Sequence, residues 1–154
     1  MNDNNPTYEL RPAAKADHDA IADIWHSSAS LEGVGPPTMP TLNELRARVD
    51  PEFAAGWVVT LAVRGDEVVG FAAIKPREAV LAELFVRPGS IGGGIGRALL
   101  AHCKMAMPEG FTLYTRSSNI RARRFYEKAG LIFLRDAVHP RTGDPVTHYG
   151  WNVR

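Results

Sequence analysis

Hydrophobic residues recur in short β-rich runs along the chain, and each run predicts a strand. The clearest is "WVVTLAVRGDEVVGFAAI" (57–74), where two such runs flank a polar "RGDE" turn and predict a β-hairpin. "YELRP" (8–12) precedes this hairpin and "AVLAELFV" (79–86) follows it. The later runs are "FTLYT" (111–115), "LIFLRD" (131–136) and "VTHYGWNV" (146–153). The pattern therefore predicts seven strands.

Four segments between these strands have the spacing of amphipathic helices. Asp17 can cap the first, and Thr41 the second, with Glu44 three residues later as in a capping box. The third covers residues 94–107 and the fourth residues 119–130. The order is strand, two helices, three strands, helix, strand, helix and two strands. We expect a single domain spanning residues 1–154.

Composition agrees with a globular domain, since 45% of the 154 residues are hydrophobic and 23% are charged. No apolar run approaches the roughly 20 residues of a membrane span. The opening "MNDNNPTYEL" lacks the basic and apolar regions of a signal peptide, so we expect a cytoplasmic protein without a membrane partner. The single cysteine, Cys103, excludes an internal disulfide and lies on an apolar helix face, which predicts a core role.

Charge is distributed unevenly. Residues 1–76 carry 6 Lys and Arg against 11 Asp and Glu, whereas residues 77–154 carry 12 against 6. The basic half is rich in arginine, which suits phosphate groups, although a chance dipole explains the same counts. Nucleic-acid binding is the weaker interpretation, because the arginines lack interleaved stacking aromatics. The five histidines show no paired ligand spacing, so we expect no metal.

The segment "LFVRPGSIGGGIGRALL" (84–100) places a glycine run between a predicted strand and a predicted helix. A dinucleotide fingerprint starting at Gly92 fails because its last position is Arg97. A Walker loop starting at Gly89 fails because no lysine follows its second glycine. Glycines that lead directly into a helix N-terminus still predict an anion site made of backbone N–H groups.

The same segment resembles the acyl-CoA-binding motif of the GNAT superfamily of N-acetyltransferases, a strand L-x-V-x-P followed by [QR]-x-x-G-x-[GA]. The motif glycines correspond to Gly94 and Gly96, and Gly92 stands where glycine is also usual. Ile91 occupies the [QR] position, which removes one side-chain contribution to a pyrophosphate site. Downstream, "NIRARRFYEKAGLIF" (119–133) is similar to the family's N-x-x-A-x-x-F-Y-E-K-x-G-F.

The resemblance covers nearly the whole chain and implies an α/β (α+β) fold. That fold is a mixed, mostly antiparallel sheet of about seven strands flanked by four helices, splayed where the fourth and fifth strands part. Its cosubstrate would be acetyl-CoA. The implied contacts to this donor are Leu84, Phe85, Val86, Ile91, Gly92, Gly93, Gly94, Ile95, Gly96, Arg97, Asn119, Ala122 and Phe125.

The resemblance implies a catalytic role for Tyr126, and the strand pattern adds Glu83 as a second candidate. Tyr126 is the candidate general acid, because a phenol is protonated at neutral pH and can donate to a departing thiolate; by itself, a tyrosine on such a helix face is usually core. Glu83 is the candidate base. Strand alternation predicts that it shares a sheet face with Leu81 and Phe85, and surface pairing with an arginine is the alternative. Glu32 and Glu78 are reserve candidates.

For the acceptor we expect contacts from Trp25, His26, Glu32 and Tyr149, with His148 and Trp151 nearby in sequence. Arg121, Arg124 and Lys128 form a basic flank that either meets a CoA phosphate or is simply solvated. The implied activity is acetyl transfer to a primary amine, by direct attack in a ternary complex. The alternative is an inactive acyl-CoA-binding sensor or interaction module. The partner is a small-molecule or peptide amine, and a monomer and a homodimer are both compatible with the sequence.

Overall fold

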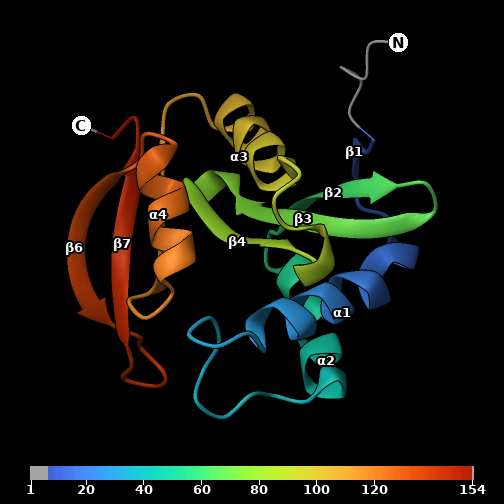
Figure 1. The fold of residues 1–154 in the computed structure, drawn as a ribbon, viewed down its shortest axis with the longest axis horizontal. Coiled ribbons are helices and arrows are strands. Elements are labelled where there is room, and N and C mark those ends of the chain that lie inside the picture. Colours follow the sequence, from blue (N-terminus) through green and yellow to red (C-terminus); the bar gives the residue numbers. More distant parts are fainter. Residues whose placement is uncertain (1–6, 154) are drawn as a thin grey trace.

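The computed structural model describes residues 7–153, and residues 1–6, which carry most of the predicted polar start, lie outside it. These residues form one seven-stranded sheet with the order β1-β2-β3-β4-β5-β7-β6 (Figure 1). All neighbouring strands are antiparallel except β4 and β5. The strands are β1 Glu9–Pro12, β2 Val58–Arg64, β3 Glu67–Lys75, β4 Val80–Val86, β5 Phe111–Arg116, β6 Ile132–Val138 and β7 Pro145–Trp151. The predicted fold class is confirmed.

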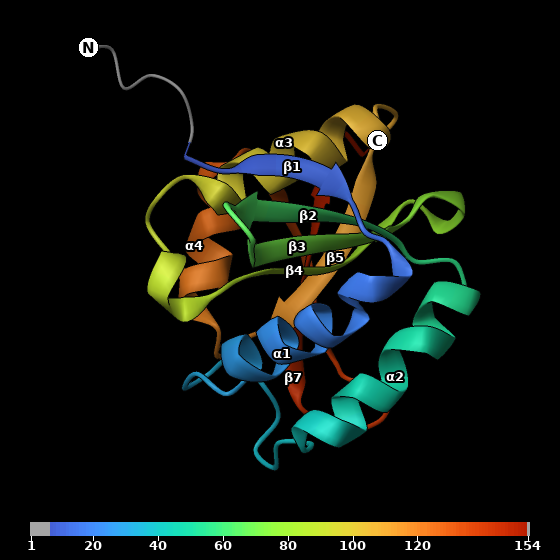
Figure 2. The same ribbon diagram turned by 90° about the vertical axis from the view of Figure 1, so that its right-hand side faces the viewer.

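Four α-helices of residues 7–153 cover the two faces of this sheet (Figure 2). They are α1 His18–Ala29, α2 Leu42–Ala54, α3 Ile95–Ala106 and α4 Ile120–Lys128. Helices α1 and α2 enclose one hydrophobic cluster around Phe71, and α3 and α4 enclose another around Leu99 and Tyr149. Cys103 is buried in the second cluster, as predicted. No helix among the described residues is long and apolar enough to cross a membrane.

Local chemistry explains where the first two helices begin. At α2 the capping box forms as predicted: Thr41 Oγ1 accepts from Glu44 N and Glu44 Oε1 accepts from Thr41 N, both at 3.1 Å. At α1 the N-cap residue is Asp17, but its side chain makes no capping bond. Its carboxylate instead binds the guanidinium of Arg11 at 2.9 and 3.0 Å, and this ion pair ties α1 to β1.

The splay between β4 and β5 positions the site. These parallel strands pair at Val80 and Thr112, near the beginning of each, and are unpaired beyond that point. The expected alternation in β4 does not hold, because a bulge makes Ala82 an extra residue: Leu81 pairs with Ile74 and Glu83 with Ala73. Leu81 therefore packs on the α3 side, whereas Glu83 occupies the register of the α1 and α2 side with Phe85.

Candidate active site

A cavity of about 1020 Å³ opens where β4 and β5 part. The end of β4, the loop leading into α3, the first turns of α3 and α4, and the loop after α1 all contribute to its wall. Its lining includes Ser28, Leu31, Glu32, Gly33, Leu84, Phe85, Val86, Ile91, Gly92, Gly94, Ile95, Gly96, Arg97, Ser118, Asn119, Arg121, Ala122, Phe125 and Tyr126. Apart from Gly93, every residue predicted to contact the acetyl donor is on this wall.

The glycine loop supplies backbone donors to this cavity. Gly92 and Gly94 have φ values of +97° and +84°, a conformation that side chains disfavour. Gly94 is the N-cap of α3 and has no side chain to cap the helix. No described residue accepts a hydrogen bond from the N–H groups between Gly92 and Arg97. These donors and the positive end of the α3 dipole therefore suit a phosphate group.

Two arginines lie beside the loop. Arg64 Nη2 is 3.9 Å from the position that a Cβ on Gly93 would take, and Arg97 Nη2 is 3.8 Å from the corresponding position on Gly94. Arg64 forms no ion pair within residues 7–153, and Ile91 is 43% exposed without adding charge. Arg64 is not part of either motif: it is the last residue of β2, 20 positions before the glycine motif begins at Leu84.

Gly96 has a different role from the loop glycines. A Cβ at this position would lie 3.2 Å from Cε1 of Phe125, which is closer than most side chains tolerate. Glycine here therefore lets α3 approach α4. The contact brings the two motifs together on one cavity wall.

Tyr126 lies on this wall and is only 8% exposed. Its burial raises the pKa of the phenol, and the nearby Glu83 and Cys103 raise this pKa further. Within residues 7–153 no protein group forms a hydrogen bond with its hydroxyl, and the ring packs against Phe125 and Tyr149. The structure therefore presents a protonated and unengaged hydroxyl beside the cavity.

Asn119 also lines the cavity, but its side chain has a structural task. It is the N-cap of α4, and its Oδ1 accepts a hydrogen bond from Ala122 N at 3.2 Å. The amide group is therefore oriented by the helix that it caps. Asn119, Ala122 and Tyr126 all line the cavity, because positions three and four apart fall on one face of α4.

Glu83 is half-buried on β4, next to the cavity-lining Leu84. Burial, and secondarily the negative charge of Glu52, raises the pKa of Glu83 to about 8. Its charge in turn raises the pKa of Tyr126 and of Tyr114, so it lies within electrostatic range of both phenols. No described arginine pairs with it, which disfavours the surface ion pair considered from the sequence.

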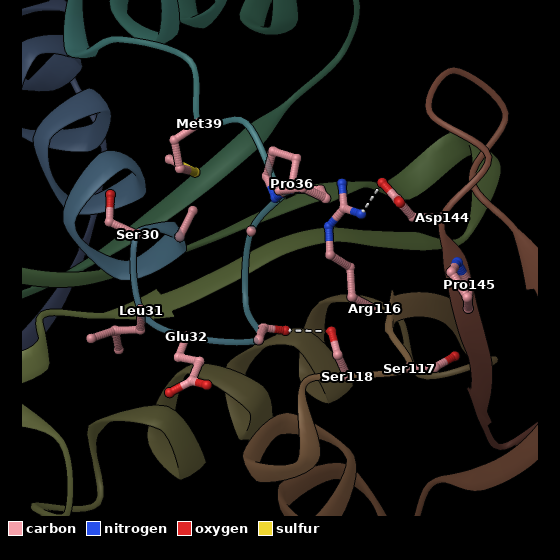
Figure 3. Close-up of a pocket in the computed structure, with 14 residues that line it drawn as sticks. Ser30, Leu31, Glu32, Pro36, Met39, Arg116, Ser117, Ser118, Asp144 and Pro145 are labelled. Carbon is pink, nitrogen blue, oxygen red and sulfur yellow. Dashed lines mark hydrogen bonds and ion pairs between the residues drawn. The ribbon is translucent and has the colours of Figure 1, made fainter.

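A second cavity of about 470 Å³ adjoins the first and shares Leu31, Glu32, Gly33 and Ser118 with it (Figure 3). The loop after α1 forms one side, and the ends of β5 and of the β6–β7 turn form the other. Ser118 Oγ donates to Gly33 O at 2.8 Å and joins these two sides. Arg116 and Asp144 form an ion pair at 2.7 Å on the wall.

The structure separates the residues predicted to contact the acceptor. Glu32 lines both cavities, but Trp25, His26 and Tyr149 line neither. Trp25 packs against Trp57 at a ring distance of 5.6 Å. Tyr149 is fully buried, and its hydroxyl donates to Glu127 Oε2 at 2.6 Å.

The remaining predicted residues fall into two groups. Arg121 lines the large cavity, whereas Arg124 and Lys128 do not, and Glu78 is exposed outside both cavities. Burial raises the pKa of the Cys103 thiol to about 12, as suits a core residue. Among the described residues, no group of three or more His, Cys, Asp or Glu side chains is arranged to hold a metal ion.

A mixed sheet that splays beside a glycine-capped helix N-terminus places backbone donors suited to a phosphate group at the wall of a large cavity. Residues 19–131 match the sequence family described as Acetyltransferase (GNAT) family. The chain belongs to this family, and the predicted resemblance is confirmed. The match includes the glycine loop, both helices on the cavity wall and Tyr126.

Individual relatives agree with this assignment. A mycothiol acetyltransferase of Thermobispora bispora is 35% identical over 85 residues, which are 55% of this chain and 28% of that protein. The chain thus spans about a quarter of the length of the curated relatives that it matches. An acetyltransferase from Thermus thermophilus superposes with a TM-score of 0.75 at 22% identity, covering 94% of this chain and 96% of that one. The PaiA N-acetyltransferase of Thermoplasma acidophilum, solved with coenzyme A, gives a TM-score of 0.72 at 17% identity, covering 94% and 99%.

Proposed function

We propose that this protein transfers the acetyl group of acetyl-CoA to a primary amine by direct attack in a ternary complex. The observation that carries the proposal is the large cavity, which runs from the unpaired N–H groups at Gly92–Arg97 to the hydroxyl of Tyr126. The N–H groups at one end of the cavity can bind a pyrophosphate, and the Tyr126 hydroxyl can donate a proton. The second cavity joins it at Glu32 and offers a separate entrance for the amine.

Different parts of the chain would bind the pyrophosphate and the thioester of acetyl-CoA. The backbone donors at the start of α3, with Arg64 and Arg97 beside them, hold the pyrophosphate. The β4 backbone between Leu84 and Val86 faces the gap to β5, where no strand pairs with it. An N–H group in that gap is available to stabilise negative charge on the thioester oxygen, an effect worth about 3 kcal/mol.

Proton transfers complete the reaction. The amine nitrogen forms a bond to the acetyl carbon, the carbon–sulfur bond breaks, and the thiolate leaves. Glu83, directly or through water, takes the proton that the amine loses, since a base with a pKa of about 8 is partly ionised near neutral pH. Tyr126 gives a proton to the thiolate and regains one from Glu83 or solvent. The attacking amine is neutral, so an acceptor that binds as an ammonium first loses one proton to solvent. From the neutral amine, the products are an amide and free CoA, with no net change in protons.

A thiol-release assay tests this proposal. Acetyl-CoA is incubated with amino acids, polyamines, amino sugars and short peptides, and a thermal melt is recorded with acetyl-CoA alone. We expect acetyl-CoA to raise the melting temperature and at least one amine to release CoA. A raised melting temperature with no thiol release from any amine would instead support the inactive acyl-CoA sensor.

A further inference from the structure

The small cavity contains a cation whose hydrogen-bonding capacity is mostly unused. Arg116 is the last residue of β5, and its side chain is 15% exposed. A guanidinium has five N–H donors, and Arg116 uses one of them to bind Asp144 Oδ2 at 2.7 Å. No other described residue accepts from it. Burying such a group is costly unless water or a ligand satisfies the remaining donors.

Asp144 holds this guanidinium in place. Hydrogen bonds from Thr142 and then from Arg116 lower the pKa of the Asp144 carboxyl, so it stays ionised near neutral pH. Figure 3 shows the Arg116 side chain extending toward Pro36, with Asp144 at its side. A guanidinium fixed at one nitrogen presents its other donors in a fork, which matches the two oxygens of a carboxylate.

The carboxylate of Glu32 lies apart from the Arg116–Asp144 ion pair. Glu32 lines both cavities, and in Figure 3 its carboxylate points away from Arg116. An ammonium group near Glu32 would be at the junction with the large cavity, which Tyr126 also lines. An anionic group on the same molecule would extend into the small cavity toward Arg116. The remaining wall is largely apolar and uncharged, with Leu31, Pro37 and Met39.

We propose that the acceptor is a free amino acid, whose carboxylate binds Arg116 in the small cavity while its amine lies at the Glu32 junction. This inference rests on the proposed acetyl transfer and names its substrate class. A volume of about 470 Å³ accommodates a single amino acid. A polyamine would leave the unused Arg116 donors without a partner and would bring positive charge against them.

Three matched sets of acceptors test the proposal: free amino acids, their amides, and the corresponding decarboxylated amines. For each set, kcat/KM is measured by thiol release in the wild type and in Arg116→Gln. Amine basicity differs among the sets, but it cancels when the acid-to-amide ratio is compared between the two proteins. We expect Arg116→Gln to lower that ratio roughly tenfold to a hundredfold, mainly through the KM for the free acid. A change of less than twofold overturns the proposal.

Two further variants separate binding from folding. Arg116→Gln leaves Asp144 without its cation, so the double variant Arg116→Gln, Asp144→Asn is measured in parallel. Both are required to keep the wild-type thermal shift with acetyl-CoA, since neither residue lines the large cavity. Arg135→Gln is the matched control: this exposed β6 arginine lines neither cavity and is expected to leave the ratio unchanged.

A binding measurement distinguishes failure of this inference from failure of the acetyl transfer. Calorimetric titrations compare leucine, phenylalanine and glutamate with their amides, in the presence of CoA. Stronger binding of the acids in wild type, lost in Arg116→Gln, supports the amino-acid site even if no amine releases thiol. Equal binding of acids and amides overturns the site, even if some other amine is acetylated.

Discussion

The two adjoining cavities differ in the groups that they offer to a ligand: backbone N–H groups in the large one and charged side chains in the small one. The large cavity takes its anion donors from the backbone of one short segment, where Gly92 and Gly94 hold the chain at positive φ. The small cavity takes its charged groups from side chains on three separate segments, represented by Glu32, Arg116 and Asp144. A backbone site is damaged by changes of conformation, whereas a side-chain site is damaged by changes of functional group. The two cavities should therefore respond to different kinds of substitution.

The largest expected effect comes from changing the conformation of the donor loop. Gly94 has a φ of +84°, where a β-branched residue is strongly disfavoured, so Gly94→Val should displace the N–H groups at the start of α3. We expect acetyl-CoA affinity, measured by calorimetry, to fall about a hundredfold. Gly56→Val imposes similar strain at φ +118° outside both cavities and should cost stability but not affinity. Near-normal affinity of Gly94→Val would show that the backbone donors are dispensable.

Removing the hydroxyl of Tyr126 should lower the turnover rate without weakening the binding of acetyl-CoA. In Tyr126→Phe the ring packing with Phe125 and Tyr149 remains, but no hydroxyl is available to the departing thiolate. We expect kcat to fall about a hundredfold, with acetyl-CoA affinity near that of the wild type. Tyr114→Phe makes the same deletion on a phenol that lines neither cavity, and its turnover should be unaffected. Undiminished turnover of Tyr126→Phe would remove the residue from the mechanism.

If Glu83 is the base, the turnover rate should depend on pH. Burial raises its pKa from 4.5 to about 8, so wild-type kcat should fall as pH drops below about 8, and Glu83→Gln should lose this limb and about tenfold in rate. If the pH profile of Glu83→Gln matches that of the wild type, another base or water takes the proton.

The same shift predicts an effect on stability. In the folded state the Glu83 carboxyl keeps its proton up to about pH 8, whereas in the unfolded chain it releases this proton near pH 4.5. The contribution of Glu83 to the free energy of unfolding is therefore greatest below pH 4.5. It declines as the pH rises from 4.5 to about 8, and above about 8 it has been lost. Between pH 5 and pH 9, Glu83→Gln should gain about 1–3 kcal/mol relative to the wild type, measured by urea unfolding. Parallel stability curves would mean that Glu83 is solvated.

Most residues on the wall of the large cavity could be located from the sequence, because they lie in local motifs. Gly94, Gly96 and Tyr126 lie in two continuous motifs, and hydrophobic periodicity located the strands and helices around them. The small cavity was not predictable in this way. Arg116 and Asp144 meet only because β5 pairs with β7, and the bulge at Ala82 changes which face Leu81 occupies. Single residues such as Trp25 and Tyr149 looked suited to a pocket, but aromatic side chains serve packing equally well.

The smallest expected effect concerns Ile91, the position where the family motif carries Gln or Arg. Arg64 and Arg97 already flank the glycine loop, so Ile91→Arg adds a third cation to the proposed phosphate site. We expect it to change acetyl-CoA affinity less than about threefold. Arg64→Ala should instead weaken affinity about threefold to tenfold and reduce its dependence on salt, because an exposed cation acts through screened attraction. A tenfold gain from Ile91→Arg, with no loss from Arg64→Ala, would show that Arg64 does not take the place of the missing side chain.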